Sequence, residues 1–268
     1  MSRKVEIDVE RVLSVVMQSP KYRDISADTV RNITIWASRR AESEKEAVKL
    51  VKRKLHQIFA AFLPLSAKRS VERLVDKTLD GDADQSFAAC KEILALHAST
   101  EERLPILHEY GVLLRSLVPP NGTVLDIACG LNPFTLPFVG LQGARYIASD
   151  IDCRLMTDID RFLRAIDPRN AGVCSDALVS RPSERVDVVL LLKAVTTLEQ
   201  QEKGASASLI AGLPAPTILM SFPTRSLGGH RRGMEATYRS LASSLFDGLG
   251  LVEEVLLGTE LFFILRRD

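Results

Sequence analysis

Three aspartates lie within or at the end of short apolar runs, and carboxylates at such places could bind a nucleoside. Asp126 lies in the run at 123–128, Asp150 ends the run at 145–150 with Asp152 just beyond it, and Asp176 ends the run at 171–176. Open α/β sheets bind ligands at the carboxyl ends of their strands. There, the second acid could accept both hydroxyls of a ribose and the third the exocyclic amine of adenine. Three acids suit a nucleoside that carries a cation, such as a sulfonium, and suit a pyrophosphate poorly.

Each acid alone has a simpler explanation, because Asp often caps the helix that follows a strand. Three acids in register favour the ligand site over that alternative. The turn after the first run holds Gly130 followed by Leu131, Asn132 and Pro133. It therefore lacks the G-x-G-x-x-G pattern with which dinucleotide folds bind phosphate, and a nicotinamide-dependent dehydrogenase is disfavoured.

The elements that would position these acids alternate in type along the second half of the chain. Apolar runs at 123–128, 145–150, 171–176, 186–192 and 216–222 are separated by helical patterns. This order predicts βαβ units and an α/β fold with a parallel sheet covered on both faces. Two further runs, at 251–257 and 261–265, are so close together that they must form an antiparallel hairpin. A mostly parallel seven-stranded sheet with such a C-terminal hairpin resembles the fold of class I S-adenosylmethionine methyltransferases.

The first hundred residues have apolar positions at helical spacing, and the last helix of this series is expected at 100–118. We therefore expect an all-α N-terminal domain at 1–105 and a methyltransferase domain at 106–268. Residues 1–80 hold 17 Lys and Arg against 11 Asp and Glu, whereas the rest of the chain holds 18 against 23. A basic front on a slightly acidic body indicates a module that binds a polyanion, although a solvated, Lys-rich bundle would have the same composition.

The cysteines and the apolar runs bear on the compartment. Cys90, Cys129, Cys153 and Cys174 form no C-x-x-C pair, so reduced cytoplasmic thiols are expected, and a zinc site is not. The longest apolar runs are too short to cross a bilayer, and the N-terminus has no signal-peptide pattern. We therefore expect a cytoplasmic protein that has no membrane partner.

Several segments resemble the aminoglycoside-resistance 16S rRNA methyltransferases, which methylate a decoding-site guanine at N7. These segments are K-L-H-Q at 54–57, L-H-A-S-T-E-E-R at 96–103, D-I-A-C-G-L-N-P at 126–133, L-L-L-K at 190–193, L-E-Q-Q at 198–201 and S-F-P-T-R-S-L-G-G at 221–229. D-I-A-C-G is common among class I methyltransferases. The patterns H-x-S-T-x-E-R and S-F-P-x-[KR]-S-L-G-G are much more specific to this family.

The resemblance implies S-adenosyl-L-methionine as the cofactor and S-adenosyl-L-homocysteine as the product. In this family pattern Arg103 pairs with the cofactor carboxylate, Asp150 binds the ribose hydroxyls, and Asp176 with Ala177 holds adenine. The complete set of implied cofactor-binding residues is Phe62, His97, Ala98, Ser99, Arg103, Ala128, Gly130, Asp150, Asp176, Ala177, Leu192 and Gln201.

The resemblance also implies the partners: 16S rRNA within the assembled 30S ribosomal subunit, with no DNA, for a protein that acts as a monomer. Candidates for phosphate contacts are the basic helix at 45–54, the pair Lys68-Arg69 and the pair Arg231-Arg232. The segment 221–233 would lie where the target base arrives, and it holds His230 where relatives often carry a basic residue. Phe134 and Phe222 could stack on an extruded base, or they could be core residues.

Methylation at N7 of guanine demands little acid–base chemistry, because this ring nitrogen has a free lone pair and no proton to lose. The sequence agrees with such a target, since it has neither the D/N-P-P-Y tetrad of exocyclic-amine methylases nor a Pro-Cys dipeptide. We therefore assign no catalytic acid or base and no metal ligand. A small-molecule methyltransferase and a non-catalytic RNA-binding assembly factor are the alternatives.

Overall fold

The computed structural model describes residues 7–60, 64–141, 143–224 and 234–267. The strands are β1 (Thr123–Ile127), β2 (Arg145–Asp150), β3 (Ala171–Cys174), β4 (Val188–Leu192), β5 (Thr217–Pro223), β6 (Leu251–Leu257) and β7 (Glu260–Arg266). The α-helices are α1 (Val9–Met17), α2 (Ala27–Ser38), α3 (Glu44–Leu55), α4 (Leu65–Asp80), α5 (Ala83–Leu94), α6 (Ala98–Glu101), α7 (Leu107–Leu117), α8 (Leu136–Val139), α9 (Cys153–Ile166), α10 (Val195–Gln201), α11 (Ala205–Gly212) and α12 (Met234–Phe246). A π-helix (His56–Ala60) follows α3, and 3₁₀-helices lie at Leu104–Ile106 and Asn132–Thr135.

The strands form one sheet in the order β3-β2-β1-β4-β5-β7-β6. β1 to β5 are parallel, and β7 pairs antiparallel with both β5 and β6. The predicted α/β fold with an antiparallel C-terminal hairpin is therefore confirmed. β4 is buried along its whole length, which explains why its sequence is a continuous apolar run.

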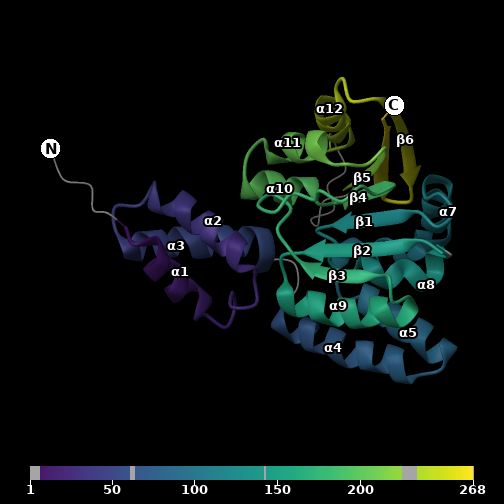
Figure 1. Ribbon diagram of the computed structural model, residues 1–268, viewed down its shortest axis with the longest axis horizontal. Helices are drawn as coiled ribbons and strands as arrows, with labels where there is room; N and C mark the ends of the chain where they lie inside the picture. Colours follow the sequence, from purple (N-terminus) through teal and green to yellow (C-terminus); the bar gives the residue numbers. More distant parts are fainter. Residues whose placement is uncertain (1–6, 61–63, 142, 225–233, 268) are drawn as a thin grey trace.

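Successive residues of each central strand face opposite sides of the sheet and contribute to two hydrophobic clusters. Val124 and Leu190 belong to the cluster that includes buried residues of α4, α5, α7 and α9. Leu125 and Val189 belong to the cluster that includes α10, α11 and α12. The two helical layers in Figure 1 thus cover the two faces of the sheet.

Helices α1, α2 and α3 have a hydrophobic cluster of their own, formed by buried residues between Val12 and Ile58. They form a separate group at the left of Figure 1. The next two helices, α4 and α5, instead contribute Val71 and Ile93 to the cluster on the sheet. Helices before residue 60 therefore pack among themselves, and helices after it pack on the sheet. The predicted domain boundary at residue 105 stays a prediction.

The single helix expected at 100–118 was wrong. α6 ends at Glu101, a 3₁₀ turn occupies Leu104–Ile106, and α7 begins only at Leu107. Pro105 lies inside the 3₁₀ turn and has no N–H for a helical hydrogen bond, so a continuous α-helix is interrupted here. This break brings α6 to the edge of the sheet at which the parallel strands end.

The expectation that every cysteine is a free thiol was also wrong. Cys153, at the start of α9, and Cys174, at the end of β3, form a disulfide with a Cα–Cα distance of 4.8 Å. The two lie close together because Asp150 pairs with Cys174 in the sheet and α9 begins just after β2. Cys90 and Cys129 are free and buried. In the part of the chain that the structure describes, no helix is long and apolar enough to cross a membrane.

Candidate functional site

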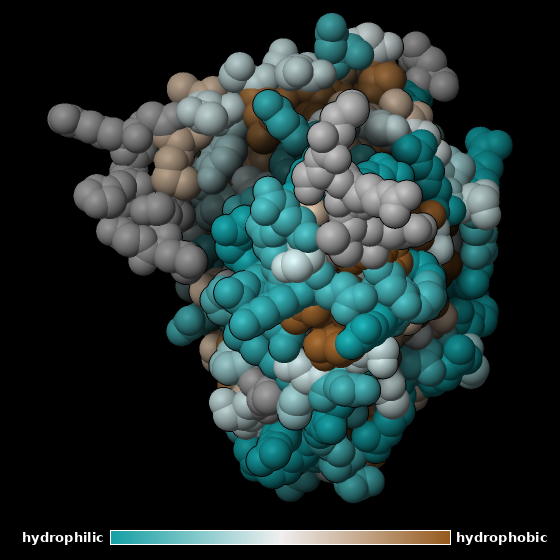
Figure 2. Space-filling model, turned by 90° about the vertical axis from the view of Figure 1, so that its left-hand side faces the viewer, coloured by the Kyte–Doolittle hydropathy of each residue, from teal (hydrophilic) through white to brown (hydrophobic). Residues whose placement is uncertain are grey.

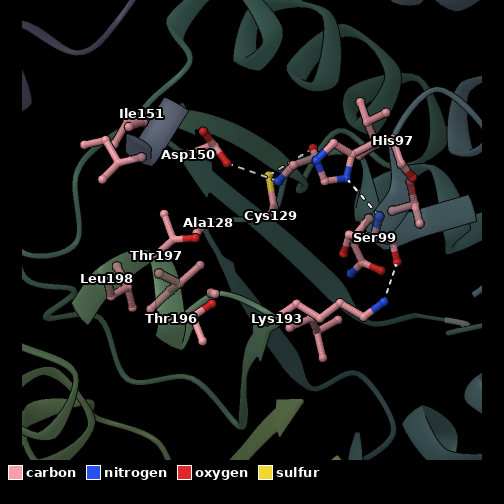
Figure 3. A pocket seen from close by; sticks show the side chains of 18 of the residues that line it. His97, Ser99, Ala128, Cys129, Asp150, Ile151, Lys193, Thr196, Thr197 and Leu198 are labelled. Atoms are coloured by element: carbon pink, nitrogen blue, oxygen red, sulfur yellow. Dashed lines mark hydrogen bonds between the residues drawn. The ribbon is translucent and has the colours of Figure 1, made fainter. Parts of the chain in front are cut away.

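A cavity of about 600 Å³ lies at the carboxyl ends of all five parallel strands. The last residues of β1, β2, β4 and β5 line it, and Ser175 and Asp176 line it just after β3. The cavity brings together eleven of the twelve expected site residues: His97, Ala98, Ser99, Arg103, Ala128, Gly130, Asp150, Asp176, Ala177, Leu192 and Gln201. The twelfth, Phe62, lies outside the described residues. Figure 3 shows Asp150 and Ile151 on one side of this cavity and His97 and Ser99 on another.

The turn after β1 is shaped for close approach to a ligand. Ala128 and Gly130 have φ angles of 54° and 50°, in the left-handed region that favours glycine. A Cβ added to Gly130 would meet no atom within 4 Å. The backbone at Gly130 is thus open to the cavity, and its N–H donates to Asp150 Oδ2 at 3.1 Å.

The two acids at the end of β2 have different tasks. Asp150 lines the cavity and also accepts a hydrogen bond from the Asp152 N–H at 3.1 Å. Burial, and then the nearby Asp152, raise the pKa of Asp150. Asp152 caps α9 by accepting from the Leu155 N–H at 3.2 Å, so the capping explanation holds for this acid.

Lys68 does not have the role expected of it. Its Nζ lies 2.5 Å from Asp152 Oδ2, and both side chains are almost completely buried. Its Nζ also lies 4.1 Å from the centre of the Phe59 ring. A buried ammonium needs such partners, so Lys68 is a structural residue that joins α4 to the β2–α9 turn rather than a phosphate contact.

Asp176 is held by hydrogen bonds from three directions. Gln201 Nε2 donates to its Oδ2 at 2.5 Å, and the Leu178 N–H donates to its Oδ1 at 2.9 Å. A third donor comes from the N-terminal helices, because Thr29 Oγ1 lies 2.8 Å from Oδ2. A carboxylate has about four acceptor positions, so among the described residues one remains unused on Oδ1, which suits a single N–H donor.

Arg103 lines the cavity and is paired within the protein. Its Nε and Nη2 donate to the two carboxylate oxygens of Glu260, at 3.1 and 2.6 Å, and its Nη1 donates to Asn132 Oδ1 at 2.7 Å. Burial is the largest single effect on this guanidinium and opposes its charge, but Glu260, Tyr110 and Asp126 together outweigh burial and raise the pKa of Arg103. These bonds use three of the five N–H groups, so two have no hydrogen-bond partner among the described residues and could serve a ligand.

Glu260 is the centre of this polar group, and sequence reasoning missed it. It also accepts from Ser221 Oγ at 2.5 Å and lies 3.7 Å from Lys193 Nζ. Burial opposes its charge, yet Arg103 and Lys193 lower its pKa. The available signal was an acid at the start of an otherwise apolar strand.

Lys193, also missed, connects the end of β4 with α6. Its Nζ donates to Glu102 Oε2 at 2.6 Å and to the Ser99 carbonyl at 3.1 Å, the second of which is drawn in Figure 3. His97 begins α6, and its Nδ1 accepts from the Ser99 N–H at 3.3 Å. Burial, and to a smaller extent the positive charge of Lys193, lowers the pKa of His97. The ring is therefore neutral at pH 7 and has a nitrogen that can accept a hydrogen bond.

Asp126, expected to be one of three acids at the site, lies in the core instead and does not line the cavity. It is completely buried, and its Oδ2 accepts from Tyr146 Oη at 2.7 Å and Asn132 Nδ2 at 2.8 Å. Its Oδ1 has no hydrogen-bond partner among the described residues. Burial raises the pKa of Asp126 to about 6. Through Asn132 it supports the Arg103 group from beneath the cavity.

Neither expected stacking residue reaches the cavity, because Phe134 and Phe222 are fully buried. Phe134 packs against Phe162 at a ring distance of 4.6 Å. Tyr238 of α12 lines the cavity, and its ring stacks on Phe222 at 4.6 Å. Tyr238 and Phe59 are therefore the described aromatic residues that line the cavity, and the sequence pattern singled out neither of them for stacking. Arg231, Arg232 and His230 lie outside the described residues.

The face of the molecule in Figure 2, which is the side where α1 to α3 lie, is mostly hydrophilic with a few apolar patches. On α3, Lys45, Lys49 and Arg53 are exposed. Trp36 of α2 lies between two cations, Arg40 and Lys54, each 4.7 Å from its ring. Within the described ranges, no group of His, Cys, Asp and Glu could hold a metal ion.

The sheet order, the cavity at the strand ends and the acids after β2 and β3 together define a class I S-adenosylmethionine-dependent methyltransferase. The family model described as "Ribosomal RNA methyltransferase (FmrO)" matches residues 18–264. The chain therefore belongs to the FmrO family of ribosomal RNA methyltransferases.

Curated relatives and solved structures match over almost the whole chain. A 16S rRNA (guanine(1405)-N(7))-methyltransferase of Frankia casuarinae is 37% identical over 97% of this chain and 94% of its own length. The enzyme of the same name from Micromonospora echinospora is 34% identical over 97% of both chains. The crystal structure of the 16S rRNA methyltransferase RmtF in complex with S-adenosyl-L-homocysteine has a TM-score of 0.86, with 30% identity over 100% of both chains.

Proposed function

We propose that this protein transfers a methyl group from S-adenosyl-L-methionine to N7 of guanine 1405 in 16S rRNA, as the names of its relatives indicate for them. The proposal rests mainly on one cavity. Residues from the ends of five strands and from α6 meet there, and they are of the types that would bind this cofactor. The same cavity extends to Tyr238 and Pro223, on the side where a base could enter.

The residues present fit the cofactor. The open backbone at Gly130 admits close approach, Asp150 would accept the ribose hydroxyls, and Asp176 has one acceptor position left for the adenine amine. The two N–H groups of Arg103 that have no partner among the described residues would bind the carboxylate of the methionine end. When bound, the cofactor supplies an electrophilic methyl group on a sulfonium.

The protein's own contribution to the reaction is positioning. N7 of guanine already has a lone pair, so no side chain needs to remove a proton. Holding the two reacting atoms in line can supply effective molarities on the order of 10⁵ M or more. The base must leave the RNA helix, because N7 lies in the deep major groove that side chains cannot enter. Tyr238, supported by Phe222, offers an aromatic face for the extruded base.

We further propose that α1 to α3 dock the enzyme on the assembled 30S subunit, and that a monomer acts in the cytoplasm. The exposed cations Lys45, Lys49 and Arg53 support phosphate contacts there. A methyl group with fixed positive charge in the decoding site would repel polycationic 4,6-linked aminoglycosides. Expression in a susceptible strain should therefore raise the inhibitory concentrations of those drugs.

The test is methyl transfer from labelled S-adenosyl-L-methionine to purified 30S subunits, with naked 16S rRNA alongside. Borohydride and aniline then cleave the RNA at an N7-methylated guanine. Cleavage at guanine 1405 in 30S subunits alone is the expected result. If the protein binds the cofactor but labels neither 30S subunits nor naked 16S rRNA, a small-molecule methyltransferase or a non-catalytic RNA-binding factor would replace the proposal.

A further inference from the structure

A short segment of the N-terminal helices is bonded to the cavity wall. The Ser26 N–H donates to the Ile151 carbonyl at 2.8 Å, and the Cys153 N–H donates to the Asp24 carbonyl at 2.9 Å. These bonds flank an antiparallel bridge between Ile25 and Asp152. The segment that leads into α2 is thus bonded, backbone to backbone, to the β2–α9 turn that follows Asp150.

One side chain extends this junction into the site itself. Thr29, in the first turn of α2, is fully buried and donates its hydroxyl to Asp176 Oδ2 at 2.8 Å. The two residues are 147 positions apart. The other donor to that oxygen, Gln201, belongs to the cavity wall. Asp176 therefore takes its orientation partly from the N-terminal helices and partly from the sheet domain.

We propose that Thr29 is a positioning residue for the adenine end of the cofactor and the link through which docking of α1 to α3 and cofactor binding affect each other. The inference rests on the proposed function. Thr29 and Gln201 fix Oδ2, and the Leu178 N–H occupies one position on Oδ1, so the remaining acceptor on Oδ1 has a set direction. If a docked RNA shifts α2, this bond changes, and the cofactor must in turn change the affinity for RNA by the same factor.

The chain supplies a matched control for this hydroxyl. Thr34 is also in α2 and fully buried, but its Oγ1 donates to the Val30 carbonyl of its own helix at 2.7 Å. Thr29→Val and Thr34→Val each replace a buried hydroxyl by a methyl group of similar size. Only the first removes a donor from Asp176.

The first measurement is calorimetric binding of S-adenosyl-L-homocysteine to the full-length protein, with thermal unfolding of each variant alongside. Thr29→Val should weaken binding about tenfold, since a hydrogen bond to a carboxylate is lost, whereas Thr34→Val should bind like the wild type. Thr29→Ser, which keeps the hydroxyl, should restore most of the affinity. If Thr29→Val does not fold, Thr29→Ala serves in its place. Equal affinities in the Thr29 and Thr34 variants would overturn the positioning role.

The second measurement uses 30S subunits. With them, Thr29→Val should raise KM for S-adenosyl-L-methionine and leave kcat largely unchanged; a fall in kcat at unchanged KM would contradict the role. In the wild type, bound S-adenosyl-L-homocysteine should change the affinity for 30S subunits. In Thr29→Val this change should be smaller, and a change of equal size in both proteins would refute the link. If the wild type binds S-adenosyl-L-homocysteine but does not methylate 30S subunits, the proposed function fails while the calorimetric comparison still decides the role of Thr29.

Discussion

The buried pair Arg103–Glu260 allows a quantitative test of how the site is held together. Both side chains are only 1% exposed, and two hydrogen bonds join them. Glu260→Ala would leave the Arg103 guanidinium buried without its counter-ion, since Asn132 supplies only a neutral acceptor. Loss of one partner from a buried ion pair costs about 3–5 kcal/mol of stability. In a chain of this size, that is a fall of roughly 6–20 °C in the unfolding midpoint.

A second glutamate in the same hairpin provides the control. Glu254 of β6 forms a two-oxygen ion pair with Arg239, but both partners lie on the surface, with 38% and 45% of their side chains exposed. Water and salt screen such a pair. Glu254→Ala should therefore leave the unfolding midpoint nearly unchanged, although it removes the same type of contact.

The assay is thermal and urea unfolding followed by circular dichroism, together with calorimetry with S-adenosyl-L-homocysteine. We expect Glu260→Ala to lose both stability and affinity, because Glu260 also holds Arg103, the residue that we propose binds the cofactor carboxylate. Glu260→Gln keeps the side-chain length but places an amide N–H₂ against an arginine donor, so an intermediate loss is expected. If Glu260→Ala unfolds at the same midpoint as Glu254→Ala, the reasoning about the buried charge is refuted.

Three further predictions concern the turn, the core acid and the disulfide. Gly130→Ala should weaken binding of S-adenosyl-L-homocysteine, because its methyl group would enter the cavity. Gly248→Ala, with φ of 68° and equally open space, is the control, because it introduces the same backbone strain away from the cavity. Equal affinities of the two variants in calorimetry would contradict this prediction. Asp126 binds its proton more tightly when folded, so the protein should lose about 3 kcal/mol of stability as the pH rises from about 4 to about 6. The free energy of unfolding, measured with urea across that range, should depend less on pH in Asp126→Asn than in the wild type. Equal pH dependence in the two proteins would contradict the raised pKa of Asp126. Denatured, unreduced protein should show two thiols by titration and four after reduction, because Cys153 and Cys174 are joined; four before reduction would disprove the bond.

The alternation of strands and helices and the C-terminal hairpin can be predicted from the amino-acid sequence. These follow from local patterns: apolar runs, turns, and a three-residue connection too short for a crossover. The acids Asp150 and Asp176 could be placed at strand ends for the same reason, since a strand end is a local feature. The family motifs added the segment from His97 to Arg103 to the predicted site. No local pattern predicts that this segment lies at the cavity.

Contacts between side chains far apart in the sequence depend on the folded arrangement and could not be predicted from local patterns. Arg103 and Glu260 are 157 positions apart, and Thr29 and Asp176 are 147 apart. Lys68 was expected on the surface and is buried against Asp152. Asp126 was expected at the site and lies in the core. Charge and spacing along the chain do not distinguish these outcomes. Whether a polar side chain lies in the core, in the cavity or on the surface depends on which elements pack against it, and that is set by the fold as a whole.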